Sequence, residues 1–65
     1  MFTAREVFQV IFWREVVDVR DKYGLEVDGG YGYAQDVFDA NPEWLDDKVN
    51  FIQASDTGRI LIVLR

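Results

Sequence analysis

The sequence predicts an α+β fold with a long N-terminal helix, a short second helix and a C-terminal antiparallel β-hairpin in a small sheet. Three observations indicate it: apolar residues recur at helical spacing in the first third, glycines gather in the middle, and the last third alternates before a β-branched run. Of the 65 residues, 49% are hydrophobic, as a small domain requires because it buries only about 60% of its unfolded surface. We expect one domain spanning residues 1–65.

The first predicted element is a helix from Ala4 to Tyr23. Thr3 and Glu6 have the spacing of a capping box, in which each side chain bonds the backbone of the other residue. Gly24 is a suitable residue to end the helix. Apolar residues at steps of four, four, three and four line one face: Phe8, Phe12, Val16, Val19 and Tyr23. The alternative is a strand over Val7–Trp13, since that segment is rich in β-branched and aromatic residues.

This helix would carry more apolar surface than one buried face needs. The additional residues are Val7, Val10, Ile11, Trp13 and Val17. A helix that is apolar most of the way round is covered either by the rest of its fold or by another subunit. We therefore expect a homodimer.

The middle of the chain predicts a glycine-rich connection and a short helix. Leu25–Tyr33 holds three of the five glycines, so we expect a loop or a tight hairpin there. Ala34–Ala40 predicts a short helix that ends before Asn41-Pro42, because the residue before a proline disfavours helical geometry. Pro42–Leu45 predicts a further helical turn.

The last third predicts an antiparallel hairpin. Lys48–Ala54 alternates in polarity, Arg59–Leu64 is nearly continuously apolar, and Ser55–Gly58 provides a turn ending in glycine. The second strand is apolar on both faces, so we expect it to lie in the centre of a sheet or under a covering layer. Asp56-Thr57-Gly58 also matches the catalytic tripeptide of aspartic proteases, but its place between two strands favours an ordinary turn.

The absence of His and Cys from the chain excludes several kinds of chemistry. It removes disulfides, thiol nucleophiles, imidazole bases and ordinary zinc sites. We expect no catalytic residue, no metal and no cofactor, and we interpret the protein as a non-enzyme. The longest apolar run is Ile60–Leu64, far below the roughly 20 residues that span a bilayer. Met1–Arg5 lacks the pattern of a secretory signal, so a cytosolic location is expected.

Negative charge is concentrated in one segment of the sequence. The chain has twelve acids and seven bases, a formal charge of -5, yet no base lies between Lys22 and Lys48. The acids of that segment are Glu26, Asp28, Asp36, Asp39, Glu43, Asp46 and Asp47. Such a segment is either a solvated surface that keeps a small protein in solution or a surface aimed at a basic partner. We predict these seven acids as partner-binding residues, with Tyr31, Tyr33 and Trp44 as aromatic anchors.

In size, acidity and charge clustering the chain resembles small phage-encoded inhibitors, the anti-CRISPR and anti-restriction proteins that act as DNA mimics. The resemblance implies a non-enzymatic protein that binds the basic surface of a nucleic-acid-handling complex, with no direct contact to nucleic acid or membrane. If the protein is phage-encoded, its location is the cytosol of the host cell. Another alternative consistent with an acidic surface is an antitoxin or adaptor that binds a basic protein.

Three stretches are similar to the pattern of BrnT-type toxins in the RelE-like ribonuclease superfamily. They are Lys22-Tyr23-Gly24-Leu25, then Asp36-Val37-Phe38 with Pro42, and Ser55 to Val63. Tyr23 stands where that family has a histidine. The resemblance implies a ribonuclease toxin-type domain as the alternative function, and such enzymes need cations that hold RNA, for which Arg59 and Arg65 are the candidates here.

Overall fold

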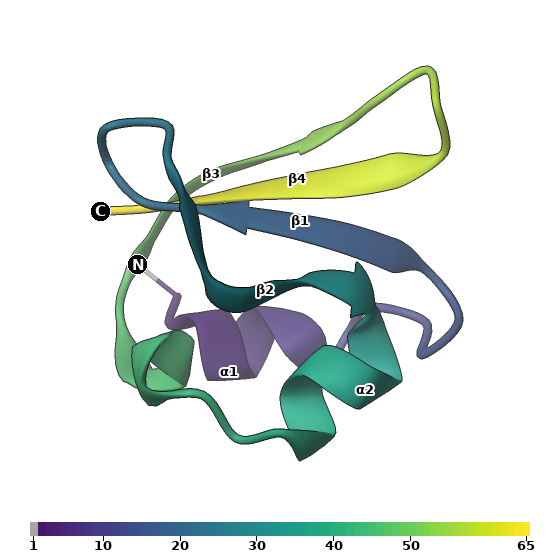
Figure 1. The fold of residues 1–65 in the computed structure, drawn as a ribbon, viewed down its shortest axis with the longest axis horizontal. Helices are drawn as coiled ribbons and strands as arrows, with labels where there is room; N and C mark the ends of the chain where they lie inside the picture. The colour runs from purple at the N-terminus through teal and green to yellow at the C-terminus, as the bar shows by residue number, and fades with distance from the viewer. Residues whose placement is uncertain (1) are drawn as a thin grey trace.

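The structure is a computed structural model that describes residues 2–65 and contains a four-stranded sheet with short helices packed on one face (Figure 1). The elements in chain order are α1 (Ala4–Phe8), β1 (Val16–Arg20), β2 (Glu26–Tyr33), α2 (Ala34–Asp39), the 3-10 turn η1 (Glu43–Asp46), β3 (Val49–Ala54) and β4 (Arg59–Leu64). The strand order is β2-β1-β4-β3, in which β1 and β4 are parallel and both outer pairs are antiparallel. Within residues 2–65 no helix has the length and apolar character needed to cross a membrane.

The predicted architecture is wrong in its first element, because there is no long N-terminal helix. The capping box is present, with the Thr3 amide donating to Glu6 Oε1 at 2.9 Å and the Glu6 amide donating to Thr3 Oγ1 at 3.2 Å. The helix that it starts is α1, which ends at Phe8. Residues 9–15 then form turns and irregular backbone, so the alternative of a strand over Val7–Trp13 is also wrong.

The second half of the predicted helix is strand β1. Val17 and Val19 are fully buried in the core, and this spacing of two residues belongs to a strand with one face on the core. Pairing with both β2 and β4 satisfies the backbone of a segment whose valines favour extended structure. Gly24 lies in the turn to β2 with a φ of 81°, and Asp21 Oδ1 accepts from the amides of Tyr23 and Leu25 at 2.8 and 3.0 Å.

The prediction of a loop or a tight hairpin at Leu25–Tyr33 is wrong, because most of this segment is the single edge strand β2. Two of its glycines meet requirements of this strand that other residues would not: a close approach to neighbouring atoms at Gly30 and a positive φ at Gly29. A Cβ on Gly30 would lie 2.7 Å from Val27 Cγ2 and 2.9 Å from the Val19 carbonyl oxygen, so β2 passes too close to its neighbours for any side chain at that position. Gly29 adopts a φ of 70°, which glycine tolerates most readily.

The remaining sequence predictions of local structure are confirmed. Helix α2 and the turn η1 form where expected, and Asn41, at a φ of 50°, follows α2. The hairpin of β3 and β4 turns through residues 55–58, where the Gly58 amide donates to the Ser55 carbonyl at 3.2 Å. Strand β4 is central in the sheet, as its apolar character on both faces indicates.

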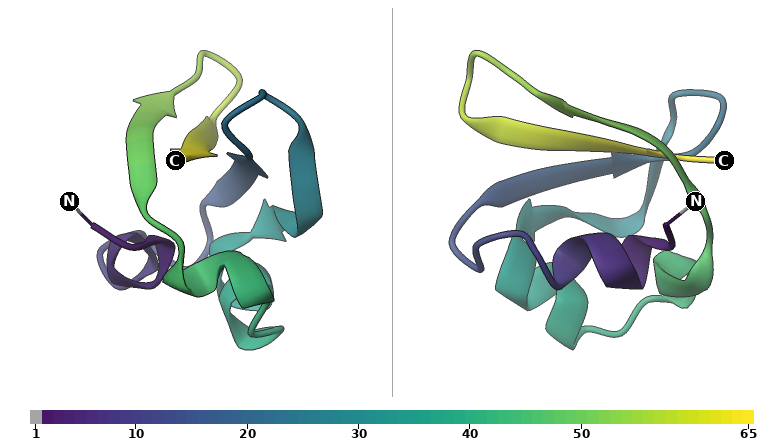
Figure 2. Two further views of the ribbon diagram at one scale, coloured as in Figure 1. Left: turned by 90° about the vertical axis from the view of Figure 1, so that its left-hand side faces the viewer. Right: turned by 180° about the vertical axis from the view of Figure 1, so that it is seen from behind.

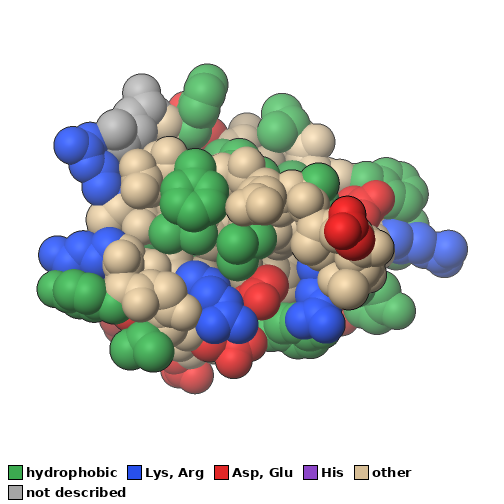
Figure 3. Space-filling view, turned by 90° about the horizontal axis from the view of Figure 1, so that it is seen from above, with side chains coloured by type: hydrophobic (Ala, Val, Ile, Leu, Met, Phe, Trp, Pro, Cys, Tyr) green, Lys and Arg blue, Asp and Glu red, His purple; other side chains and the backbone are tan. Residues whose placement is uncertain are grey.

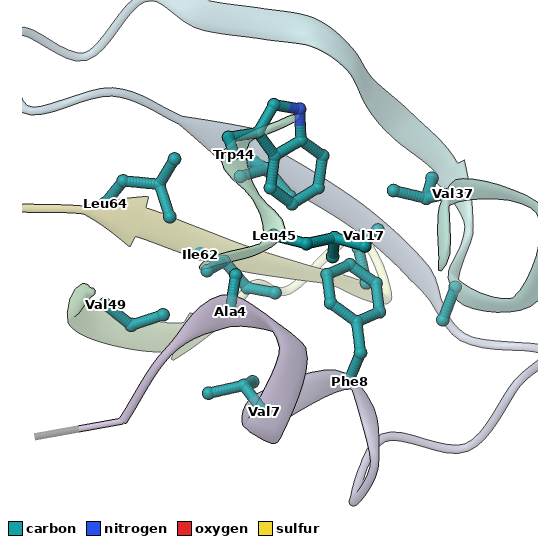
Figure 4. Packing of buried hydrophobic residues seen from close by; sticks show 12 residues of the cluster. Ala4, Val7, Phe8, Val17, Val37, Trp44, Leu45, Val49, Ile62 and Leu64 are labelled. Carbon is teal, nitrogen blue, oxygen red and sulfur yellow. The ribbon is translucent and has the colours of Figure 1, made fainter. Parts of the chain in front are cut away.

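The core lies between the sheet and the layer formed by α1, α2 and η1, as the two views in Figure 2 show. Its largest fully buried side chains are Leu45, Ile62, Val17 and Val19. Figure 4 shows the side chains of Phe8 and Trp44 pointing into the core between the two layers. Their ring centroids are 6.0 Å apart. Leu45 and Trp44 come from η1, so a single turn of helix places two large residues in the core.

We predict that Gly30→Ala destabilises the protein by about 1–3 kcal/mol, because the new methyl group would overlap Val27 and the Val19 carbonyl. Gly29→Asn is the control: nothing lies within 4 Å of a Cβ there, and asparagine tolerates a positive φ. Urea denaturation followed by circular dichroism measures both variants. Equal stabilities for the two would contradict the close approach at Gly30.

We also predict that the capping box gives a pH-dependent contribution to stability. The backbone and side-chain hydrogen bonds from Thr3 hold the pKa of Glu6 below its ordinary value of 4.5. A carboxylate with a depressed folded pKa stabilises above its unfolded pKa and loses that contribution as pH falls through the folded pKa. Wild type should therefore exceed Glu6→Gln in free energy of unfolding at pH 7, and the difference should close in strong acid. A difference that stays constant down to pH 2 would contradict this.

Candidate partner-binding surface

The seven acids of the base-free segment are all exposed side chains. The set comprises Glu26, Asp28, Asp36, Asp39, Glu43, Asp46 and Asp47, and we call it the acidic side. These residues belong to β2, α2, η1 and the residue that follows η1. In Figure 1, α2 and η1 lie along the lower side of the molecule, below the sheet. The Trp44 indole donates to the Asp28 carbonyl at 2.8 Å, which joins η1 to the beginning of β2.

Among the described residues, Asp46 and Asp39 of the acidic side have side-chain partners. Asp46 Oδ1 lies 3.0 Å from Arg5 Nε, and the side chains of this pair remain 77% and 39% exposed. Asp39 Oδ1 accepts a hydrogen bond from the side-chain amide nitrogen of Gln35 at 2.7 Å, and both residues belong to α2. An exposed ion pair of this kind contributes only about 0–1 kcal/mol, so a stronger cationic partner can replace Arg5.

Trp44 is a core residue. Its side chain is 8% exposed, its ring packs on Phe8, and its indole nitrogen is bonded to a backbone carbonyl of β2. A buried indole with a satisfied N–H is typical of a structural tryptophan. The predicted aromatic anchor therefore has no exposed ring to offer a partner at this position.

Tyr31 and Tyr33 are exposed, but they lie on the face of the sheet opposite the helices. They pair with Asp18 and Val16 of β1, whereas the alternate residues of β1 point into the core, and cross-strand partners share a face. The two side chains are 51% and 56% exposed. Figure 3 views the molecule from the sheet side and shows hydrophobic, basic and acidic side chains mixed on this face. The two tyrosines thus lie on the open face of the sheet, opposite α2 and η1, although Tyr33 and Asp36 of α2 border the same hollow.

The main ion pair of this open face joins Asp18 and Arg20. Asp18 is buried although it is charged, and its two carboxylate oxygens accept from Arg20 Nε and a terminal guanidinium nitrogen at 3.3 and 3.2 Å. These hydrogen bonds and the charge of Asp18 raise the pKa of Arg20. Another cation, Arg59, lies 5.6 Å from the centre of the Tyr31 ring. Arginine and aromatic side chains are therefore combined on the open face.

A hollow of about 390 Å³ brings predicted and unpredicted residues together at the start of α2. Tyr33 and Asp36 line it beside Trp13, Arg14 and Gln35. The Arg14 guanidinium lies 4.8 Å from the centre of the Trp13 indole ring. Trp13 and Arg14 are not among the predicted partner-binding residues, because both fall within the predicted long helix. The sequence signal for these two residues is that a tryptophan and an arginine are adjacent, since an arginine side chain can stack on an indole ring.

A second hollow of about 380 Å³ follows the glycines of β2. It is lined by Glu26, Val27, Asp28, Gly29, Gly30 and Tyr31, so it unites two of the predicted acids with one predicted tyrosine. Within the described residues no three or more acids are grouped so that they could hold a metal ion. What the acidic side offers is a set of separate carboxylates in water.

We predict that Trp44 contributes to stability and not to partner contact. Trp44→Ala should cost about 3–5 kcal/mol, and Trp44→Phe about 1–3 kcal/mol, because it leaves the Asp28 carbonyl without its donor. Tyr33→Ala, at an exposed position, should change stability by less than about 1 kcal/mol. Chemical denaturation distinguishes the three variants, and a Trp44→Ala protein as stable as wild type would contradict the assignment.

Comparison with known proteins gives no relative from which a function could be transferred. No protein-family model, curated protein or solved structure matches the chain. What the protein binds must therefore be argued from its own surface.

Proposed function

We propose that the protein is a non-enzymatic binding protein that inhibits a nucleic-acid-handling complex by occupying its basic surface. The observation that supports this proposal is the exposure of all seven carboxylates of the acidic side. Carboxylates held at the surface of a rigid fold can stand where the phosphates of DNA would lie and can pair with the same lysines and arginines.

The distribution of charge supports an oriented approach to such a partner. The acidic side belongs to a segment without lysine or arginine, while the rest of the chain has seven bases against five acids. Two of those bases, Arg20 and Arg59, lie in the strands β1 and β4. A protein with separated charge is steered so that its acidic side meets a basic surface first, which raises the association rate.

The low cost of desolvation also supports the proposal. The seven carboxylates are exposed, and the ion pair between Arg5 and Asp46 is itself solvated. Binding therefore does not have to break a strong internal interaction before a new one forms. The pair of Asp18 and Arg20 is different, because Asp18 is buried and removing Arg20 would leave its charge without compensation. We place the protein in the cytosol, or in the host cytosol if it is phage-encoded, where such complexes work.

A second candidate, a ribonuclease toxin-type domain, has one observation in its favour. Arg59, which belongs to the stretch similar to BrnT-type toxins, is exposed and lies beside the ring of Tyr31. Arginine with an exposed aromatic ring can hold RNA by charge and stacking. RNA cleavage that disappears in Arg59→Ala would favour this candidate. An antitoxin or adaptor function would be recognised by recovery of a basic toxin as the partner.

We predict that neutralising part of the acidic side weakens binding. The immobilised wild-type protein should recover a nucleic-acid-binding partner, and duplex DNA should displace it. The triple variant Asp36→Asn, Asp39→Asn and Glu43→Gln should lower the association rate about tenfold at low salt, with a smaller effect at high salt, because screening removes steering. Surface plasmon resonance with the recovered partner measures both rates.

The control adds the same charge away from the acidic side. Phe12→Lys, Glu15→Gln and Thr57→Lys lie outside the base-free segment and change the net charge by the same amount as the triple variant. If this control binds the partner at the wild-type association rate, the position of the charges and not the total charge determines binding. Equal loss in both variants, or a partner that DNA does not displace, would contradict the proposal.

A further inference from the structure

We propose that the free edge of β3 is a pairing surface for a second copy of this chain, so that two sheets join into one across a two-fold axis. This inference goes beyond the proposed function, since it concerns a different surface and a different partner. It also moves the expected homodimer contact away from the long helix, which does not exist, to a strand edge and its flanks.

Among residues 2–65, the cover on the outer edge of β3 reaches only the beginning of the strand. β4 pairs along one side of the strand, and β3 is the outermost strand of the sheet. On the other side the N-terminal residues cover its beginning, where the Val49 amide donates to the Phe2 carbonyl at 2.8 Å and the Ala4 amide donates to the Asp47 carbonyl at 2.9 Å. Residues 50–54 continue beyond this cover and are all exposed. An exposed strand edge with unpaired backbone groups is a template for another strand.

Apolar side chains lie on both sides of this edge. A groove of about 390 Å³ between α1 and β3 is lined by Phe2, Glu6, Val7, Gln9, Val10 and Ile52. Of these, Phe2 is 67%, Val10 85% and Ile52 49% exposed. On the opposite face of the strand Phe51 is 46% exposed. A strand added at this edge would cover all four of these side chains, whose exposure is otherwise unfavourable.

The charges favour a second copy of this chain as the added strand. Residues 49–55 contain no charge, and Lys48 and Asp56 each lie four residues from Ile52. Thr3 already bridges Lys48 on this side of β3, so an antiparallel pair aligned on Ile52 would join residues 50–54. Each Lys48 side chain would then extend toward the Asp56 turn of the other copy, so that the ends attract while the centre is uncharged. A copy approaching through the acidic side would instead meet like charges, because the chain carries a net charge of -5. The edge of β3 is thus self-complementary.

The position of α1 is compatible with this arrangement. The left view of Figure 2 shows α1 below β3, on the core side of the sheet. Two copies joined at β3 would bring their α1 helices to either side of the two-fold axis, beneath the new junction. Val10 and Phe2 of each copy would then face the apolar surface of the other. The groove between α1 and β3 is therefore the place into which the Ile52 side chain of the second copy fits.

The test is the mass of the full chain in solution across a concentration series, measured by sedimentation equilibrium. We expect wild type to approach twice the 7.6 kDa chain mass. Ile52→Lys would place two like charges at the axis and should raise the dimer dissociation constant at least about tenfold. Leu25→Lys, which alters another exposed apolar residue, in the turn before β2, should leave the dissociation constant unchanged. Circular dichroism confirms that each variant is folded.

A charge exchange tests the alignment itself. Lys48→Glu should weaken the dimer at low salt, and the double variant Lys48→Glu with Asp56→Lys should restore it, because the attraction between the two ends returns. A wild-type chain that stays monomeric up to millimolar concentration would overturn the proposal. So would a dimer that survives Ile52→Lys or dissociates in Leu25→Lys. These measurements need no other partner, so their failure is distinct from failure of the proposed inhibitory function.

Discussion

The parallel pairing of β1 with β4 is the interaction on which the rest of the structure depends. It joins the first third of the chain to its last strand, in a register that places Val17 beside Ile60 and Val19 beside Ile62. Val17, Val19 and Ile62 are fully buried, so one face of both central strands is fixed as the core face. Parallel neighbours need a crossover, and everything between them, including α2 and η1, forms that crossover.

This constraint also decides how the charges are distributed. The base-free segment lies within the crossover, so its acids are carried by β2, α2 and η1. The bases of β1 and β4, with Tyr31 and Tyr33 beside them, lie in the sheet. The charges are segregated along the sequence, but in space Arg5 lies beside Asp46 and Arg14 borders the same hollow as Asp36. The strand order and register further show that Tyr31 and Tyr33 lie on the face of the sheet opposite α2 and η1.

Local features were predictable from the sequence, and features that depend on distant pairing were not. The Thr3 capping box, the ends of α2 and the turn at Ser55–Gly58 each depend on residues within a few positions of one another. β1 depends on a partner about 40 residues away, because Val16–Arg20 fits a helical face as well as a strand until β4 is placed beside it. Gly30 is similar, because the reason that no side chain fits at this position is the closeness of Val19 and Val27, which only the fold reveals. For the site, the exposure of the acids followed from their charge, whereas the burial of Trp44 required the Asp28 carbonyl as its acceptor.

The edge of β3 and the acids of β2 and α2 can act together because the strand order keeps them apart. β2, which carries Glu26 and Asp28, and β3, which would pair with a second copy, are opposite edges of the sheet. Joining two copies through β3 would leave β2 and α2 facing outward in both. A two-fold dimer would then present two acidic sides in a fixed relation, and engaging both with one basic partner would be an intramolecular step after the first contact. For a chain of 65 residues, which offers little area of its own, such pairing is a physical route to tight binding.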